Sequence, residues 1–342
     1  MEQNRRNSSI ELLRILLVIG VFLHHLQTSS NGLMSYVIEG SFNHYFFLII
    51  ESVDICSVNT FILISAYYLS QNNKRNYSKI VFLITEIIII NVLYYLCFAI
   101  NNNVFIFSDF ILYLIPRNYY VILYSVLYII SPYINVLLDS LDKRKTKKML
   151  IIFIVIFSFI SYFVDIVEFV FNIPLDGLSP IGLYGSQEGY TIVNFVLLYF
   201  IGAYIRRKDT ILSIKKSTLY YGLCVLGLFV FSLLSIKIVK IPVWNYNNPL
   251  IIMSSVYLLY IFLNIKLDSK FINHISRAVY SFFLIHVLVF PYIQIESLAN
   301  SPIIIVLIKE ILILLVLYFV SFIFDLIYRS LFNHVIKINN RK

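Results

Sequence analysis

The first apolar segment carries the residues whose types and spacing are best suited to chemistry, an arginine and a histidine eleven positions apart. In a helix, Arg14 and His25 would be separated by three turns plus about 20°, and by about 16 Å along the axis. Both side chains would therefore lie on one face, with Glu11 one turn before Arg14. His24 would be turned by about 100° from His25. One face of one helix thus presents a carboxylate, a guanidinium and an imidazole.

This face could support proton transfer next to a bound anion. An imidazole can act as a general base on a hydroxyl near neutral pH, and a guanidinium can grip a phosphate or carboxylate with two parallel hydrogen bonds. Plainer interpretations remain open from the residues alone. Arg14 could extend toward the membrane surface while paired with Glu11, and His25 could make only a local hydrogen bond. His286, in a later apolar segment, fits a functional or a packing role equally well.

Several kinds of site are missing from the sequence. It contains no P-loop, no Gly-x-Ser-x-Gly turn and no cluster of His and Cys with metal-ligand spacing. No metal ligand is therefore expected. A histidine acting as a base on a hydroxyl is the simplest chemistry that the remaining residues support.

Composition places the whole chain in a membrane. Of the 342 residues, 60% are hydrophobic and 13% are charged, and the mean hydropathy is +0.84. Soluble domains carry about 25% charged residues. Apolar runs near the length needed to cross about 30 Å of hydrocarbon recur along the chain. We expect one all-α integral-membrane domain over residues 1–342, with about ten spanning helices at residues 10–27, 53–70, 79–100, 119–138, 149–170, 190–206, 217–236, 248–264, 277–297 and 303–328.

Two further apolar stretches, residues 42–50 and 104–115, are too short to span easily and are predicted to be interfacial or re-entrant. The loops give an independent test of the topology. With a cytoplasmic N-terminus, 22 of the 27 Lys and Arg residues fall on the cytoplasmic side and only Arg117, Lys237 and Lys240 fall outside. This asymmetry predicts that both termini are cytoplasmic. It also explains the net charge of +9 without a nucleic-acid partner.

The first segment resembles the opening of the acyltransferase 3 family of bacterial membrane acyltransferases. That family begins with an acidic residue, an Arg three positions later and a His eleven positions after the Arg, a pattern that Glu11, Arg14 and His25 reproduce. Other family landmarks follow in order over about residues 8–330. They are Val58 to Tyr67, Asn118 to Val121 with Ser131-Pro132-Tyr133-Ile134-Asn135, Leu198 to Ile205, and Tyr280 to His286. Two departures are Ala66, where the family usually has Gly, and Tyr120-Val121, where a Trp-Phe pair is common.

The resemblance implies transfer of an acyl group, typically acetyl, from cytoplasmic acyl-CoA to a hydroxyl of an extracytoplasmic glycan, cell-wall polymer or lipid-linked sugar. It implies a multi-pass protein of the bacterial plasma membrane with no bound cofactor, acetyl-CoA being the donor substrate. His25, Arg14 and Glu11 are the expected catalytic residues. Asn59, Ser65 and His286 are expected to contact substrate.

Two other classes of function remain as alternatives. A glycan transporter or flippase could be built from a similar bundle, but it gives no special meaning to Arg14 and His25 on one face. A glycosyltransferase acting on lipid-linked sugars would need an acidic pair or a large outer loop. The first outer loop, residues 28–52, offers only Glu39 and Glu51, which are isolated in the sequence.

Overall fold

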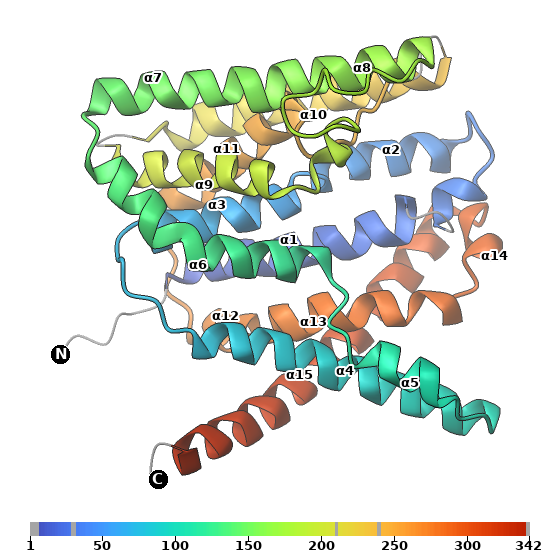
Figure 1. Cartoon of the computed structure of the whole chain (residues 1–342). Coiled ribbons are helices and arrows are strands. Elements are labelled where there is room, and N and C mark those ends of the chain that lie inside the picture. Colours follow the sequence, from blue (N-terminus) through green and yellow to red (C-terminus); the bar gives the residue numbers. More distant parts are fainter. Residues whose placement is uncertain (1–6, 29–31, 209–210, 238–240, 340–342) are drawn as a thin grey trace.

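Figure 1 shows the computed structural model of the chain, which describes residues 7–28, 32–208, 211–237 and 241–339. Every regular element in these residues is a helix, and none is a strand. The expectation of an all-α membrane bundle is therefore confirmed.

The helices follow one another through short connections. In order they are α1 (Ser8–Thr28), α2 (Phe42–Asp54), α3 (Ser57–Leu69), α4 (Ser78–Asn102), α5 (Phe107–Tyr113), α6 (Tyr119–Asp139), α7 (Lys143–Ile154), α8 (Ser161–Phe171), α9 (Ile192–Arg207), α10 (Ile214–Lys237), α11 (Pro249–Asn264), α12 (Lys270–Ile275), α13 (Val279–Ile285), α14 (Ile295–Ala299) and α15 (Ile303–Asn339). A π-helical segment, Val155–Ile160, joins α7 and α8 into one continuous helical rod.

Eight helical rods within the described residues are long and apolar enough to cross a membrane. They are α1, α2 with α3, α4, α6, α7 with α8, α10, α12 with α13, and α15. The other two predicted spans correspond to α9 and α11, which have 16 residues each. Helices of that length reach only about 24 Å. Most of α9 is buried among its neighbours, so protein rather than lipid surrounds it.

Three predicted boundaries differ from the structure. The prediction that residues 42–50 form a separate piece is wrong, because α2 and α3 make one broken span over Phe42–Leu69. The two residues between them, Ile55 and Cys56, keep right-handed helical backbone angles, so the chain continues in nearly the same direction. The span predicted to end at residue 297 leaves regular helix at Leu288, and α15 continues to Asn339.

Helices α3 and α9 cross in close contact at the centre of the bundle (Figure 1). Gly202 of α9 makes this approach possible. A Cβ at that position would lie 2.7 Å from the Ala66 Cβ and 2.7 Å from the Leu63 carbonyl oxygen. Small residues let helix backbones approach in membranes, where packing rather than the hydrophobic effect drives association. The extra methyl group of Ala66 is accommodated because its partner is glycine.

The Ser-Pro segment of α6 has a structural role. Pro132 has no N–H to donate to the Tyr128 carbonyl one turn earlier. The Ser131 hydroxyl donates to that carbonyl instead, at 2.7 Å, and accepts from Arg75 Nε at 2.8 Å. Asn135 Nδ2 donates to the Leu69 carbonyl at 3.0 Å. The segment therefore fastens the loop between α3 and α4 to α6.

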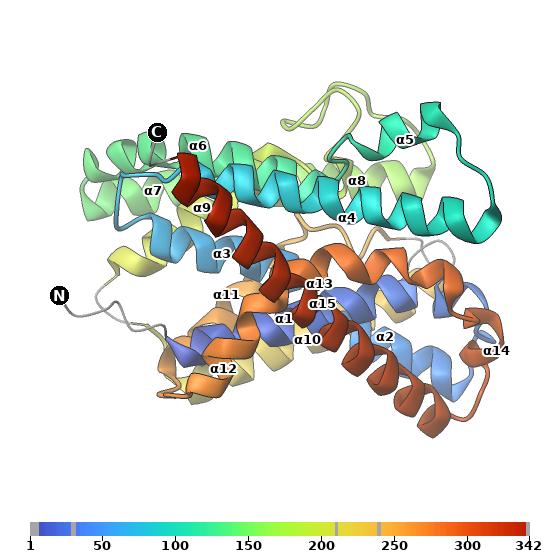
Figure 2. The same ribbon diagram turned by 90° about the horizontal axis from the view of Figure 1, so that it is seen from below.

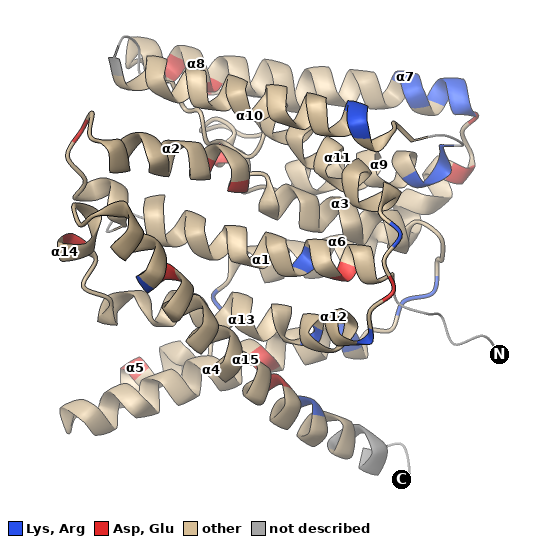
Figure 3. Ribbon diagram, turned by 180° about the vertical axis from the view of Figure 1, so that it is seen from behind, with Lys and Arg blue, Asp and Glu red and all other residues tan. Residues whose placement is uncertain are grey.

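The bundle is electrically asymmetric along its length. Figure 3 shows most Lys and Arg residues at the end of the bundle where α1 begins and α15 ends, including the start of α7 and the end of α9. In Figure 2, α15 crosses the bundle obliquely, and it packs against α13. The start of α1 and the end of α15 at one end of the bundle agree with an even number of crossings. The cytoplasmic assignment of that end stays a prediction from its charge.

Candidate active site

A cavity of about 490 Å³ begins at the Lys- and Arg-rich end of the bundle and follows α1 inward. Helices α1, α3, α4, α6 and α13 contribute its walls. Glu11 and Arg14 line it near the start of α1, and Val21 lines it two turns deeper. The cavity thus lies along the face of α1 that was predicted to carry the chemistry.

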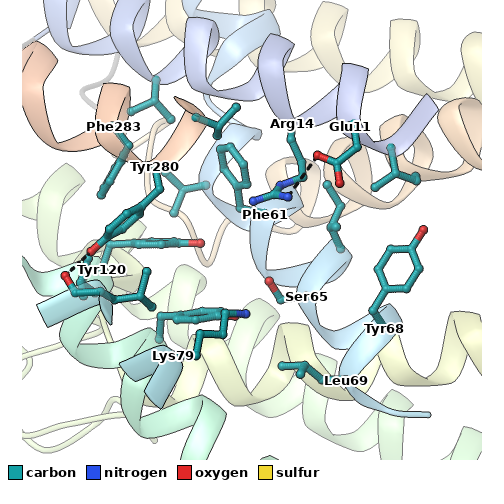
Figure 4. A pocket seen from close by; sticks show the side chains of 18 of the residues that line it. Glu11, Arg14, Phe61, Ser65, Tyr68, Leu69, Lys79, Tyr120, Tyr280 and Phe283 are labelled. Carbon is teal, nitrogen blue, oxygen red and sulfur yellow. Dashed lines mark hydrogen bonds and ion pairs between the residues drawn. The ribbon is translucent and has the colours of Figure 1, made fainter. Parts of the chain in front are cut away.

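Arg14 lies against the cavity with its guanidinium pointing into the space between α1 and α3 (Figure 4). Its Nη1 is 3.2 Å from the Glu11 Oε2, and the two side chains are 37% and 11% exposed. The predicted pairing with Glu11 is therefore present, and it holds Arg14 at the cavity instead of at the outer surface of the bundle. The other N–H groups of the guanidinium have no hydrogen-bond partner among the described residues, and such donors suit an anion.

Lys79 of α4 is a second cation on the cavity wall. Its Nζ donates to the Tyr124 hydroxyl at 3.0 Å and lies 5.2 Å from the centroid of the Tyr128 ring. In the sequence, Lys79 is only one of the Lys and Arg residues that indicate the topology, because nothing there places the start of α4 opposite α1. The fold brings Arg14 and Lys79 to the same cavity.

Aromatic side chains form much of the remaining wall, notably Tyr120 and Tyr124 of α6 and Tyr280 and Phe283 of α13 (Figure 4). The Tyr120 and Phe283 ring centroids are 5.2 Å apart. The Tyr280 hydroxyl donates to the Leu83 carbonyl at 2.8 Å and so fixes α13 against α4. The cavity is therefore cationic near its mouth and aromatic further in.

His25 does not line the cavity itself but lies one turn beyond Val21, which lines its deep end. Its ring centroid is 5.2 Å from that of His286, which follows α13. Phe283, on the cavity wall, has its ring centroid 6.0 Å from His286. His286 is 1% exposed. Its Nδ1 is 3.1 Å from the Phe282 carbonyl oxygen, while its buried Nε2 has no hydrogen-bond partner among the described residues.

Of the three residues predicted to contact substrate, Ser65 lines the cavity and His286 lies next to its deep end. Asn59 does not line it. The Asn59 side chain is buried and its Nδ2 donates to the Tyr246 carbonyl at 2.8 Å. In this structure Asn59 fastens α3 to the chain before α11.

His24 occupies a different environment from His25, as the helical rotation predicts. Its Nδ1 is 2.6 Å from Glu51 Oε1 and 3.0 Å from the Thr28 hydroxyl. Glu51 was taken as an isolated residue of an outer loop, and this is wrong. It lies in α2, it is fully buried, and Asp54 follows it one turn later. Residues 28–52 were predicted to be a loop between the first two spans, whereas Phe42–Asp54 form helix α2.

The acyltransferase domain model of the acyltransferase 3 family matches residues 7–328. The chain belongs to this family. It is therefore a membrane acyltransferase. Neither the curated proteins nor the solved structures contain a match to this chain.

The two departures from the pattern of the acyltransferase 3 family have distinct places in the structure. Ala66 lies at the crossing of α3 and α9, where Gly202 accepts its methyl group. Tyr120 and Val121 both line the cavity. The first departure is therefore a matter of helix packing, whereas the second changes the wall of the candidate site.

Proposed function

We propose that the chain is an O-acyltransferase that moves an acetyl group from cytoplasmic acetyl-CoA to a hydroxyl of a glycan outside the cytoplasm. The observation that carries this proposal is the cavity along α1, which joins Glu11 and Arg14 to the neighbourhood of His25 and His286. A guanidinium at one end of the cavity, with two imidazoles just beyond its other end, suits a donor that carries phosphates and a reactive acyl group.

The donor is proposed to enter from the end that bears Arg14 and Lys79. Coenzyme A carries phosphates, and a guanidinium with an ammonium nearby suits such a group. The cavity of about 490 Å³ is within the usual range of about 300–1,000 Å³ for small-molecule sites. Its apolar and aromatic inner wall suits the acyl-bearing arm better than the nucleotide, so the nucleotide is proposed to stay near the mouth.

His25 is proposed to act as the general base. It accepts the proton of the acceptor hydroxyl as the oxygen attacks the thioester carbonyl. A C–O bond forms, the C–S bond breaks, and the departing sulfur of coenzyme A takes up a proton. His286 is the nearest group to receive or return that proton, because its ring lies against that of His25.

The acceptor is proposed to approach from the opposite end of the membrane. His25 lies in the last turn of α1, away from the end where Lys and Arg gather. If that basic end is cytoplasmic, His25 faces the outer side of a bacterial plasma membrane. A surface polysaccharide, cell-wall polymer or lipid-linked glycan would then be the natural source of the hydroxyl.

The test is acetyl transfer by the purified protein in lipid nanodiscs. Radiolabelled acetyl-CoA should be bound and slowly hydrolysed, and label should pass to lipid-linked or polymeric glycan from the source cells. Mass spectrometry of the surface glycan should show an acetyl ester that is lost with the gene. Movement of glycan across the membrane without any acetyl-CoA turnover would contradict the proposal and favour a transporter.

A further inference from the structure

A buried group of polar side chains lies next to the candidate active site but outside its cavity. His24 of α1 and Glu51 and Asp54 of α2 each offer a ligand atom, and these atoms lie within 4.8 Å of one another. Glu51 and Asp54 are three residues apart in one helix, which places both carboxylates on the face toward α1. None of the three residues lines the cavity.

The charges in this group are poorly compensated. Glu51 is 0% and Asp54 is 6% exposed. Both Asp54 carboxylate oxygens are buried without a hydrogen-bond partner among the described residues. The described Lys and Arg side chains form no salt bridge with either carboxylate, and Glu51 pairs only with His24. Isolated carboxylates inside a membrane protein are costly unless a cation or a proton neutralises them.

The close packing of α1 against α2 holds these polar side chains together in the interior of the bundle. A Cβ at Gly20 of α1 would lie 3.1 Å from the Asp54 Cβ and 2.5 Å from the Ser57 hydroxyl oxygen. The absence of a side chain at Gly20 therefore allows the end of α2 to press against α1. Gln27, one turn after His24, is also fully buried, and neither of its amide atoms has a hydrogen-bond partner in the part of the chain that the structure describes. Unpartnered polar atoms are thus concentrated on this side of α1.

We propose that His24, Glu51 and Asp54 bind a divalent transition-metal ion. An imidazole with two carboxylates suits zinc or manganese, since imidazole favours the former and carboxylate oxygens are good ligands for both. A dipositive ion balances the two carboxylates, which a neutral imidazole does not. The ion gives Asp54 the partner that the described protein groups do not supply.

The His24 and Glu51 ligand atoms need only a small adjustment, and the Asp54 carboxylate lies within 4.8 Å of them. Ligands about 2.0–2.2 Å from a tetrahedral zinc ion lie about 3.3 Å from one another. His24 Nδ1 and Glu51 Oε1, now 2.6 Å apart, would therefore separate by less than an ångström as the ion replaces their hydrogen bond. The Thr28 hydroxyl donates to Glu51 Oε2 at 3.4 Å, where it can orient that carboxylate. Its present contact with His24 Nδ1, at 3.0 Å, would be replaced by the bond from this nitrogen to the ion.

The ion would also hold the end of α1 against α2. The His24 and His25 rings are edge to face with centroids 5.4 Å apart, so fixing His24 restricts the position of His25. His24, Glu51 and Asp54 are proposed as ligands and, through His25, as positioning residues. Binding of the ion does not depend on the proposed acyl transfer and can be measured without it.

The experiment is metal analysis of the full chain purified in nanodiscs through a tag that contains no histidine. After dialysis against a chelator, calorimetric titration with ZnCl₂ or MnCl₂ should show one high-affinity site per chain. Asp54→Asn and Glu51→Gln should each weaken binding by at least about tenfold, and Thr28→Val by a smaller factor. The bound metal should raise the midpoint of thermal unfolding in the unaltered protein and should not do so in Asp54→Asn.

Glu86→Gln is the matched control, because Glu86 is another buried carboxylate and contacts Ser281 on α13 instead. It should bind the metal as the unaltered protein does. If the unaltered protein binds no metal in a one-to-one ratio, the inference is wrong and the group is neutralised by protons. Binding that survives both Asp54→Asn and Glu51→Gln would equally overturn it. Neither result bears on acetyl transfer, which is measured separately.

Discussion

The rings of His25 and His286 lie with centroids 5.2 Å apart and planes inclined by 57°, one in the first helix and the other just after α13. The His286 backbone and Nδ1 are fixed by the preceding helical turn, which leaves its buried Nε2 without a partner among the described residues. The pair therefore joins two segments that are remote in sequence, just beyond the cavity-lining residues Val21 and Phe283.

His25→Ala should abolish detectable acetyl transfer while expression and acetyl-CoA binding survive. A general base contributes about 10²- to 10⁴-fold in rate, and no other described histidine except His286 is next to the cavity's deep end. Single-turnover transfer of label from acetyl-CoA measures the effect. His274→Ala is the control, because His274 is an exposed histidine at the end of α12. Near-normal transfer by His25→Ala would refute the mechanism and leave the family assignment intact.

His286→Gln should lower kcat with little change in the KM for acetyl-CoA. The amide can still donate to the Phe282 carbonyl, so the local fold is kept, but it cannot accept and return a proton as an imidazole does. The loss should be smaller than that caused by His25→Ala. Steady-state kinetics of the two variants decides the order. A larger loss at His286 would make it the base and His25 the supporting residue.

Arg14→Lys should raise the KM for acetyl-CoA and lower kcat/KM by about tenfold or more. A guanidinium can hold a phosphate through two parallel hydrogen bonds, and an ammonium cannot. Arg144→Lys is the control, since Arg144 is exposed near the start of α7 and away from the cavity. Arg75 is not a suitable control, because its guanidinium donates structural hydrogen bonds to the Ser131 hydroxyl and to the Leu69 carbonyl, which its replacement by Lys would disturb. If Arg14→Lys binds acetyl-CoA as tightly as the unaltered protein, Arg14 contributes only a positive charge at the end of the helix and does not hold a phosphate through two hydrogen bonds.

Gly202→Ala should destabilise the bundle by about 1–3 kcal/mol, the usual cost of forcing an extra methyl group into a packed contact. The new Cβ would meet Ala66 and the backbone of Leu63, neither of which can rotate away. Gly222→Ala is the control, because nothing lies within 4 Å of a Cβ at that position. Unfolding of both variants in the same detergent gives the comparison. Equal midpoints would show that α3 and α9 are less closely packed than the structure describes.

The topology can be tested with single cysteines in a chain whose three native cysteines are replaced. Cysteine at Lys145 or Lys208 should be protected from an impermeant thiol reagent in intact cells, because these positions lie at the end rich in Lys and Arg. Cysteine at Pro180 or Glu296, both exposed, should react. Labelling at Lys145 with protection at Pro180 would invert the orientation and place the mouth of the cavity outside the cytoplasm.

The sequence by itself determined the features that depend on local properties of the chain. Hydropathy marks the membrane helices because crossing a bilayer requires a long apolar segment with its backbone hydrogen bonds satisfied internally. Helical periodicity places Arg14 and His25 on one face, because the angle per residue is the same in every α-helix. The spacing of Glu11, Arg14 and His25, together with the ordered motifs that follow it over about residues 8–330, indicated the family.

Only the tertiary structure decided which helices meet. The approach of His286 to His25, of Lys79 to the cavity of Arg14, and of Asp54 to His24 depends on how several helices cross. Crossing angles and distances follow from the fit of side chains on both surfaces, as at Gly202 and Ala66, and no local period encodes them. For the same reason Asn59 lies in a packing contact away from the cavity, although its place in the family pattern suggested a contact with substrate.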